Sequence, residues 1–250
     1  MFKSRKMRPG VLLILFSALS AHESAGAQHY GITLGVSRVI YPLNGKGVAI
    51  NITNPQDYPV LVKTVVLDEQ HKNEAPFYVT PPLFRLDGGQ MNAMSIIRTG
   101  GNYPSDRESI NWLCAQGIPP GTDSVWADSD GKEGSSGAGK VSMNMQVIVG
   151  SCIKMIIRPE SINGNPVDMA DKISWRIAGK SITARNPTPF YMNIKSILFN
   201  GAKVNMTRSY IPPFSEENMP LPSGHYVKGT LEWEIIGDHG EKHKKVTALN

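Results

Sequence analysis

The sequence has little net charge, only two cysteines and no apolar run long enough to cross a membrane. The apolar run at residues 11–21 has eleven residues, whereas a transmembrane helix needs about 20. Basic residues precede this run and Ala25-Gly26-Ala27 follows it, as in a cleavable secretory signal peptide. We therefore expect residues 1–27 to be removed after Ala27, which gives an exported protein with no membrane insertion.

The small net charge argues against nucleic-acid binding. The whole chain carries a net charge of +5, and removing the leader takes away four Lys or Arg residues and one Glu, which leaves +2. Binding to nucleic acid requires basic residues that gather on one face. A weak excess of this kind gives no such signal, so we expect no nucleic-acid partner.

A sustained helical period is also missing after the leader, which excludes a helical fold. Short runs of β-branched and aromatic residues, such as "GVAINITN" and "GTLEWEIIGDHG", alternate with turn sequences such as Asn54-Pro55 and Asn200-Gly201. An immunoglobulin-like sandwich takes about 100 residues. We predict an all-β protein with two such domains, at residues 28–158 and 159–250, and a surface loop at 121–140.

The sequence lacks the residue patterns of an enzyme or a cofactor site. "GSSGAGK" at residues 134–140 resembles part of a phosphate-binding loop, but Val141 stands where Ser or Thr is needed. His239 and His243 have no third metal ligand in view, so we interpret them as residues of a solvated tail. No serine has the surroundings of a nucleophile elbow. We expect no catalytic residue, metal or cofactor.

The two cysteines are predicted to pair. Export places Cys114 and Cys152 where thiols are oxidised, which favours one disulfide over two buried thiols. Closing a loop of this length would stabilise the fold by roughly 2–4 kcal/mol.

The segment "VSMNMQVIVGSCIKMIIRP" at residues 141–159 alternates like a strand but is unusually long. One face of the predicted strand is apolar and comprises Val141, Met143, Met145, Val147 and Val149. Residues 141–153 contain no charge or proline that would protect an exposed edge, which favours an edge where a partner adds a strand. A bulge near Gly150-Ser151, which would give two ordinary strands, stays as the alternative.

Two cations lie among apolar neighbours on separate predicted strands. Arg38 lies in "GVSRVIYP" and Lys154 in "CIKMIIRP". Burying either charge without a partner is costly, so each should face solvent, an acid or a bound anion.

Several separated segments resemble one family. "YPSDRESINWLCAQGIPP" at residues 103–120 resembles the signature of the periplasmic pilus chaperones of the chaperone/usher pathway, although Ala115 departs from its larger aliphatic residue. "SRVIYP", "TPPLFRL", "CIKMIIRP" and "ARNPTPFYMNI" extend the likeness along the chain. The resemblance implies two immunoglobulin-like domains in an L or boomerang arrangement. The long predicted loop and the cysteine pair resemble the long-loop branch of this family.

The resemblance also implies roles for particular residues. Arg38 and Lys154 match the cations that bind the C-terminal carboxylate of a fibre subunit, and the apolar face from Val141 to Val149 matches the donor strand. Glu108, Arg158 and Asp238 match an interdomain ion-pair network. Cys114 and Cys152 would tie strands at the base of the donor strand.

The implied function is a chaperone that stabilises exported fimbrial or adhesin subunits by donor-strand complementation and delivers them to an outer-membrane usher. An exported fibre subunit or adhesin is the alternative, and such a client should have a single incomplete domain. A secreted hydrolase would need a catalytic constellation. Self-association of the chaperone without a subunit stays open.

Overall fold

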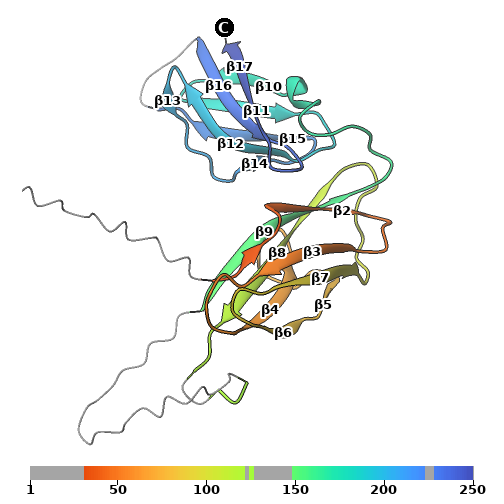
Figure 1. Cartoon of the computed structure of the whole chain (residues 1–250). Helices are drawn as coiled ribbons and strands as arrows, with labels where there is room; N and C mark the ends of the chain where they lie inside the picture. Colours follow the sequence, from red (N-terminus) through yellow and green to blue (C-terminus); the bar gives the residue numbers. More distant parts are fainter. Residues whose placement is uncertain (1–30, 122–123, 127–147, 223–227, 250) are drawn as a thin grey trace, which may run out of the picture.

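The protein forms two β-sandwiches, seen in the computed structural model in Figure 1. The structure describes residues 31–121, 124–126, 148–222 and 228–249. The predicted leader, most of the predicted loop at 121–140 and the segment 141–147 lie outside these ranges. Within them, no helix is long and apolar enough to cross a membrane.

The N-terminal sandwich packs a four-stranded sheet against a five-stranded one. The first sheet has the order β1-β3-β7-β5 and the second β2-β9-β8-β4-β6. All pairs are antiparallel except β2 and β9, which run parallel. The strands are β1 (Thr33–Leu34), β2 (Arg38–Pro42), β3 (Val48–Thr53), β4 (Val60–Leu67), β5 (Phe77–Thr80), β6 (Leu83–Leu86), β7 (Met91–Arg98), β8 (Ser109–Ile118) and β9 (Val149–Arg158).

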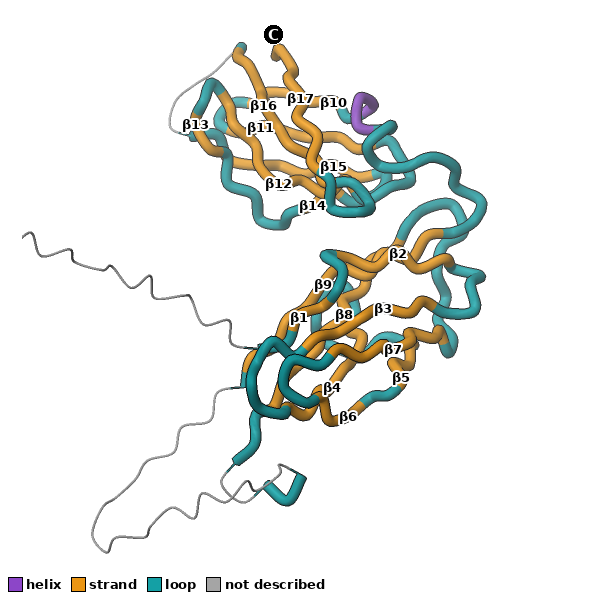
Figure 2. The backbone as a smooth tube through the Cα atoms, in the orientation of Figure 1, coloured by secondary structure: helices purple, strands orange, loops and turns teal. Residues whose placement is uncertain are grey.

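The C-terminal sandwich packs a sheet of order β10-β11-β15 against one of order β13-β12-β16-β17, with β14 also paired to β12. One short 3-10 helix, η1 (Ala170–Lys172), precedes it. Figure 2 shows how strands dominate both units. The strands are β10 (Ser174–Ala178), β11 (Ser181–Asn186), β12 (Met192–Phe199), β13 (Ala202–Lys203), β14 (Tyr210–Ile211), β15 (Ser215–Pro220), β16 (Gly229–Ile236) and β17 (Lys242–Leu249).

Each sandwich has its own core, built by the alternation that the sequence displays. In β4 and β16 every second residue is buried, because successive side chains of a strand point to opposite faces. The N-terminal core includes Tyr41 and Met94, and the C-terminal core includes Phe190 and Trp233. The predicted all-β fold with two immunoglobulin-like sandwiches is therefore confirmed. The division at Arg158–Pro159 stays a prediction, although β9 does end at Arg158.

Strand β8 departs from simple alternation, and the departure locates the domain contact. Its residues are buried on both faces along much of its length. One face lies on the N-terminal core, whereas Ile110 on the other face packs with Tyr191 and Tyr210 of the C-terminal sandwich, and Trp112 lies beside them. Burying apolar side chains of this size contributes roughly 1.5–3 kcal/mol each. The domains therefore meet over β8 and its neighbour β9.

The N-terminal chain changes sheets at Pro81 and Pro82, because it leaves one sheet after β5 and enters the other at β6. One expectation about the C-terminal end was wrong. His243 is exposed as expected, but it belongs to a strand and not to a tail: β17 pairs with β16 over eight residues. The lysines on this edge strand hid its half-buried alternation, and such lysines are common where an edge must not attract other strands.

Candidate binding site at the interdomain face

The parallel pairing of β2 with β9 brings the two predicted cations together. Arg38 is directly opposite Lys154 in this register, and Trp112 of β8 is opposite Lys154 on the other side. Cross-strand partners point to the same face of a sheet. Arg38, Lys154 and Trp112 therefore form one row across the face that meets the C-terminal domain.

Neutral oxygen atoms of the C-terminal domain surround the Lys154 ammonium. Its Nζ donates to Asn193 Oδ1 at 2.8 Å, to Ser209 Oγ at 2.9 Å and to the Ser209 carbonyl at 3.3 Å. The ammonium also lies over the Tyr210 ring, 5.0 Å from its centroid. Burial, with a smaller contribution from the positive charge of Arg38, lowers the pKa of Lys154 to about 8.

Arg38 makes fewer hydrogen bonds than Lys154. Its Nη1 donates one long hydrogen bond, 3.5 Å, to the Ile236 carbonyl, and its Nε is buried without a hydrogen-bond partner among the described residues. Burial lowers the pKa of Arg38, an effect that the negative charges of Asp238 and Glu241 oppose. Arg38 also lines a pocket of about 440 Å³ with Val39, Ile50 and other residues. Two neighbouring cations with incomplete charge balance make a site suited to an anion.

Nearer the domain junction, the same sheet face carries a neutralised cluster. Arg158 Nε donates to Glu108 Oε1 at 2.7 Å, and its Nη1 donates to Asp238 Oδ2 at 2.7 Å. Glu108 Oε2 also accepts from the Tyr191 N–H at 2.7 Å, and the Glu108 side chain is wholly buried. Burial raises the pKa of Glu108 to about 7, against the opposing effects of Arg158 and the Tyr191 N–H. The structure thus brings together the three residues that the resemblance placed in one network.

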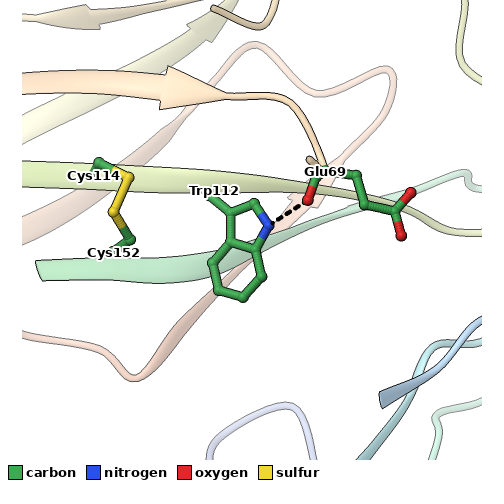
Figure 3. The surroundings of a disulfide bond; sticks show 4 residues. All are labelled: Glu69, Trp112, Cys114 and Cys152. Atoms are coloured by element: carbon green, nitrogen blue, oxygen red, sulfur yellow. Dashed lines mark hydrogen bonds between the residues drawn. A yellow bond between two sulfur atoms is a disulfide. The ribbon is translucent and has the colours of Figure 1, made fainter. Parts of the chain in front are cut away.

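The disulfide lies on the same face, beyond Lys154 as seen from the junction. Cys114 and Cys152 are opposite each other in β8 and β9 and are bonded, as Figure 3 shows. The predicted disulfide is therefore confirmed. The nearby Trp112 ring donates from Nε1 to the Glu69 carbonyl at 3.1 Å.

The edge of β9 beyond the cations is open. Strand β2 pairs with β9 only from Lys154 to Arg158, and no other described strand pairs with residues 149–153 on that side. The β8–β9 register runs through Gly150 and Ser151 without a shift, so the bulge considered as the alternative is not present there. Of the predicted donor-strand residues, Val149 is half-buried, whereas Val141, Met143, Met145 and Val147 lie outside the described residues.

The orientation of Val149 relates this edge to the core. Val149 lies on the strand face of Ile153, Met155 and Ile157, which pack in the N-terminal core, rather than on the face of Lys154. An apolar strand that continued outward with this alternation would extend the side of the sheet that already covers the core.

Sequence reasoning missed the C-terminal half of this site. Asn193 and Ser209 bind Lys154, and the Tyr210 hydroxyl donates to Glu69 Oε1 at 3.1 Å. Arg208 adds a longer ion pair to Glu69, at 3.9 Å. These contacts join residues that are 39 to 141 positions apart in the chain, and no spacing signal encodes them. The one hint of this half of the site in the sequence was Asn193, a polar residue within the apolar run of β12.

Comparisons with known proteins define first the class and then the family. Residues 31–163 match the family described as "Pili and flagellar-assembly chaperone, PapD N-terminal domain", and residues 168–247 match "Pili assembly chaperone PapD, C-terminal domain". Two sandwiches of this kind in this order define a pilus-assembly chaperone. The chain belongs to the PapD family of these chaperones.

Individual relatives agree with this assignment. The chain is similar to the chaperone protein AfaB of Escherichia coli, with 47% identity over 81% of each chain. It is also similar to the chaperone protein caf1M of Yersinia pestis, with 40% identity over 91% of this chain and 90% of that one.

Solved structures give the same result. The E. coli chaperone DraB matches with 42% identity and a TM-score of 0.75, over 88% of this chain and 96% of that one. A Salmonella enterica structure, the SafA pilin in complex with the SafB chaperone, matches with 34% identity and a TM-score of 0.74, over 87% and 96%. These findings support a fimbrial chaperone, a non-enzymatic role, over a fibre subunit or adhesin.

Proposed function

We propose that this chaperone captures fibre subunits by binding their C-terminal carboxylate between Arg38 and Lys154 and pairing their chain with the open edge of β9. The observation that carries the proposal is the register of β2 and β9, which sets two poorly neutralised cations beside the start of an unpaired edge. A carboxylate accepts charge-assisted hydrogen bonds from both cations and relieves their mutual repulsion.

The apolar residues of the proposed donor strand would supply most of the affinity. Val141, Met143, Met145, Val147 and Val149 alternate in the sequence. Burying five such side chains is worth roughly 10 kcal/mol before the costs of ordering and association are subtracted. Because a slip by one residue turns this face away, the carboxylate anchor would fix the register. Val149 lies on the face of the sheet that covers the N-terminal core. This placement supports a subunit core that continues the core of the chaperone.

The proposal also covers the location of the protein, the delivery of the subunit and the angle between the two domains. The SafA pilin and SafB chaperone form a complex, which supports a pilin-like or adhesin-like client here. We place the mature protein in the periplasm, after removal of residues 1–27, with an outer-membrane usher as the recipient of the subunit. The Glu108–Arg158–Asp238 network would fix the angle between the domains, and the disulfide would hold the base of the donor strand.

Co-expression with candidate fibre subunits tests the proposal. A tagged chaperone secreted to a bacterial periplasm should co-purify with a small β-rich subunit, and Arg38→Ala or Lys154→Ala should abolish this. Lys195→Ala is the matched control, because Lys195 is an exposed lysine of the other domain that pairs with Glu234 at 2.9 Å. The carboxylate anchor would be contradicted if the subunit still co-purified undiminished with both Arg38→Ala and Lys154→Ala. It would also be contradicted if Lys195→Ala lost the subunit to the same extent.

A further inference from the structure

Asn193 occupies an unusual position for a buried amide. It lies in β12 between Met192 and Ile194, which pack in the C-terminal core, and its side chain therefore points to the opposite face, toward the N-terminal domain. Only 1% of Asn193 is exposed. A polar group buried to this extent needs a partner. Its Oδ1 has one in Lys154, and its Nδ2 donates to the Tyr191 carbonyl at 3.4 Å.

Ser209 differs from Asn193 in being exposed. The Ser209 carbonyl also accepts a hydrogen bond from the Ile194 N–H at 3.0 Å, so the backbone at this position is fixed. The hydroxyl accepts from Lys154 through Oγ, and a hydroxyl that accepts one bond still has a proton to donate. That proton is available beside the ammonium, on the exposed side of the site.

We propose that the C-terminal domain contributes two residues to the carboxylate site: Asn193, which positions the Lys154 ammonium, and Ser209, whose hydroxyl donates to the bound carboxylate. The inference rests on the proposed function, because it names further members of the same anion site. The site then has three donors, namely the Arg38 guanidinium, the Lys154 ammonium and the Ser209 hydroxyl. Arg38 and Lys154 come from one domain and Ser209 from the other, so the angle between the domains sets the spacing of the donors.

Asn193 serves this site better than a carboxylate would. An Asp at this position would neutralise Lys154 within the free protein and compete with the subunit for it. A leucine would leave the ammonium without its shortest hydrogen bond. The amide oxygen therefore orients the cation without cancelling its charge.

The protonation of Lys154 in the free protein tests the role of Asn193 without any subunit. We would titrate protein labelled with 13C at lysine Cε, assign Lys154 through Lys154→Arg, and compare variants. The charged neighbour that affects Lys154 is Arg38. Asn193→Leu should lower the pKa of Lys154 by about one pH unit or more, because a hydrogen bond to the charged form is lost. Asn193→Asp should raise it, and this nearly isosteric variant keeps the test valid if Asn193→Leu does not fold. A pKa of Lys154 unchanged in Asn193→Asp would overturn the positioning role.

Acetate, as a small carboxylate, tests the role of Ser209. Acetate at constant ionic strength should shift the Lys154 signal in the parent protein, and Ser209→Ala should weaken this response several-fold. Ser215→Ala is the matched control, because the Ser215 hydroxyl donates to the Pro212 carbonyl away from the site. An equal acetate response in Ser209→Ala and the parent would overturn the ligand role. No response in the parent would instead contradict the anion site of the proposed function, and the Asn193 titration would still be decided by its own result.

Discussion

Two basic clusters lie on the same sheet face and differ in what balances their charge. Arg158, nearer the domain junction, meets two carboxylates within 2.7 Å. Lys154 and Arg38, farther along, meet only neutral oxygen atoms through hydrogen bonds. The carboxylates of the first cluster balance its charge by direct hydrogen bonds, whereas Asp238 and Glu241 act on Arg38 only through their charges. We propose that this difference in charge balance separates a structural site from a binding site.

The largest expected effect comes from breaking the neutralised cluster. Arg158→Ala would leave the buried Glu108 carboxylate without its cation, and we expect the free energy of unfolding to fall by about 3–5 kcal/mol. Urea unfolding at pH 7.5 measures this. Because Glu108 would then bind a proton more tightly, the loss should shrink as the pH is lowered. A loss below 1 kcal/mol would show that this cluster is not the structural one.

Removing the disulfide tests whether the binding part of the sheet needs a covalent tie. Cys114→Ser/Cys152→Ser should lower the free energy of unfolding by about 2–4 kcal/mol, since the bond constrains the unfolded chain. We also expect weaker subunit binding, because the bond joins β8 and β9 beside the open edge. Calorimetry with a co-purified subunit, at a temperature where the variant is folded, measures the second effect. Binding as tight as that of the parent would mean that the disulfide has no part in the site.

A substitution in the cluster of Arg38 and Lys154 should have the opposite effect to Arg158→Ala. Lys154→Met removes a poorly neutralised cation, so we expect stability to change by no more than about 1 kcal/mol, while affinity for the subunit falls about 100-fold. The free energy of unfolding and the subunit affinity, measured in parallel, compare Lys154→Met with Arg158→Ala. A large loss of stability with unchanged affinity would reverse the roles assigned to the two clusters.

The pH dependence of subunit binding is a further test of Lys154 as a ligand. Lys154 has a pKa of about 8 in the free protein, and a bound carboxylate would raise it. Subunit affinity should therefore be level just below pH 8 and fall about tenfold per pH unit above it. In the free protein the sign is reversed: the folded chain binds fewer protons than the unfolded chain between pH 8 and 10.5, so the Lys154 contribution to stability rises with pH there. Affinity that stays level up to pH 10 would exclude Lys154 as a ligand.

The sequence was sufficient for features that depend on local pattern. Alternation located strands such as β3, β4 and β16, because each buries one face. Export and a pair of cysteines predicted the disulfide. The resemblance supplied the positions of Arg38, Lys154 and the Glu108 network, which the structure then brought together in space.

The rest of the site depends on how two domains meet, which no local pattern encodes. Asn193 and Ser209 belong to a different sandwich from Lys154, and their contact arises only when β8 and β9 pack on the C-terminal domain. The same holds for the bond from Tyr210 to Glu69. β17 was missed for another reason, since its lysines conceal the pattern of a strand whose outer face is solvated.

A crystal structure of the chaperone with its subunit would test the proposed binding mode most directly. We expect the subunit's terminal carboxylate to lie between Arg38 and Lys154, within hydrogen-bond distance of both, and its chain to pair with β9 from Val149 onward. A complex in which Lys154 still binds only Asn193 and Ser209, with the β9 edge unpaired, would contradict it.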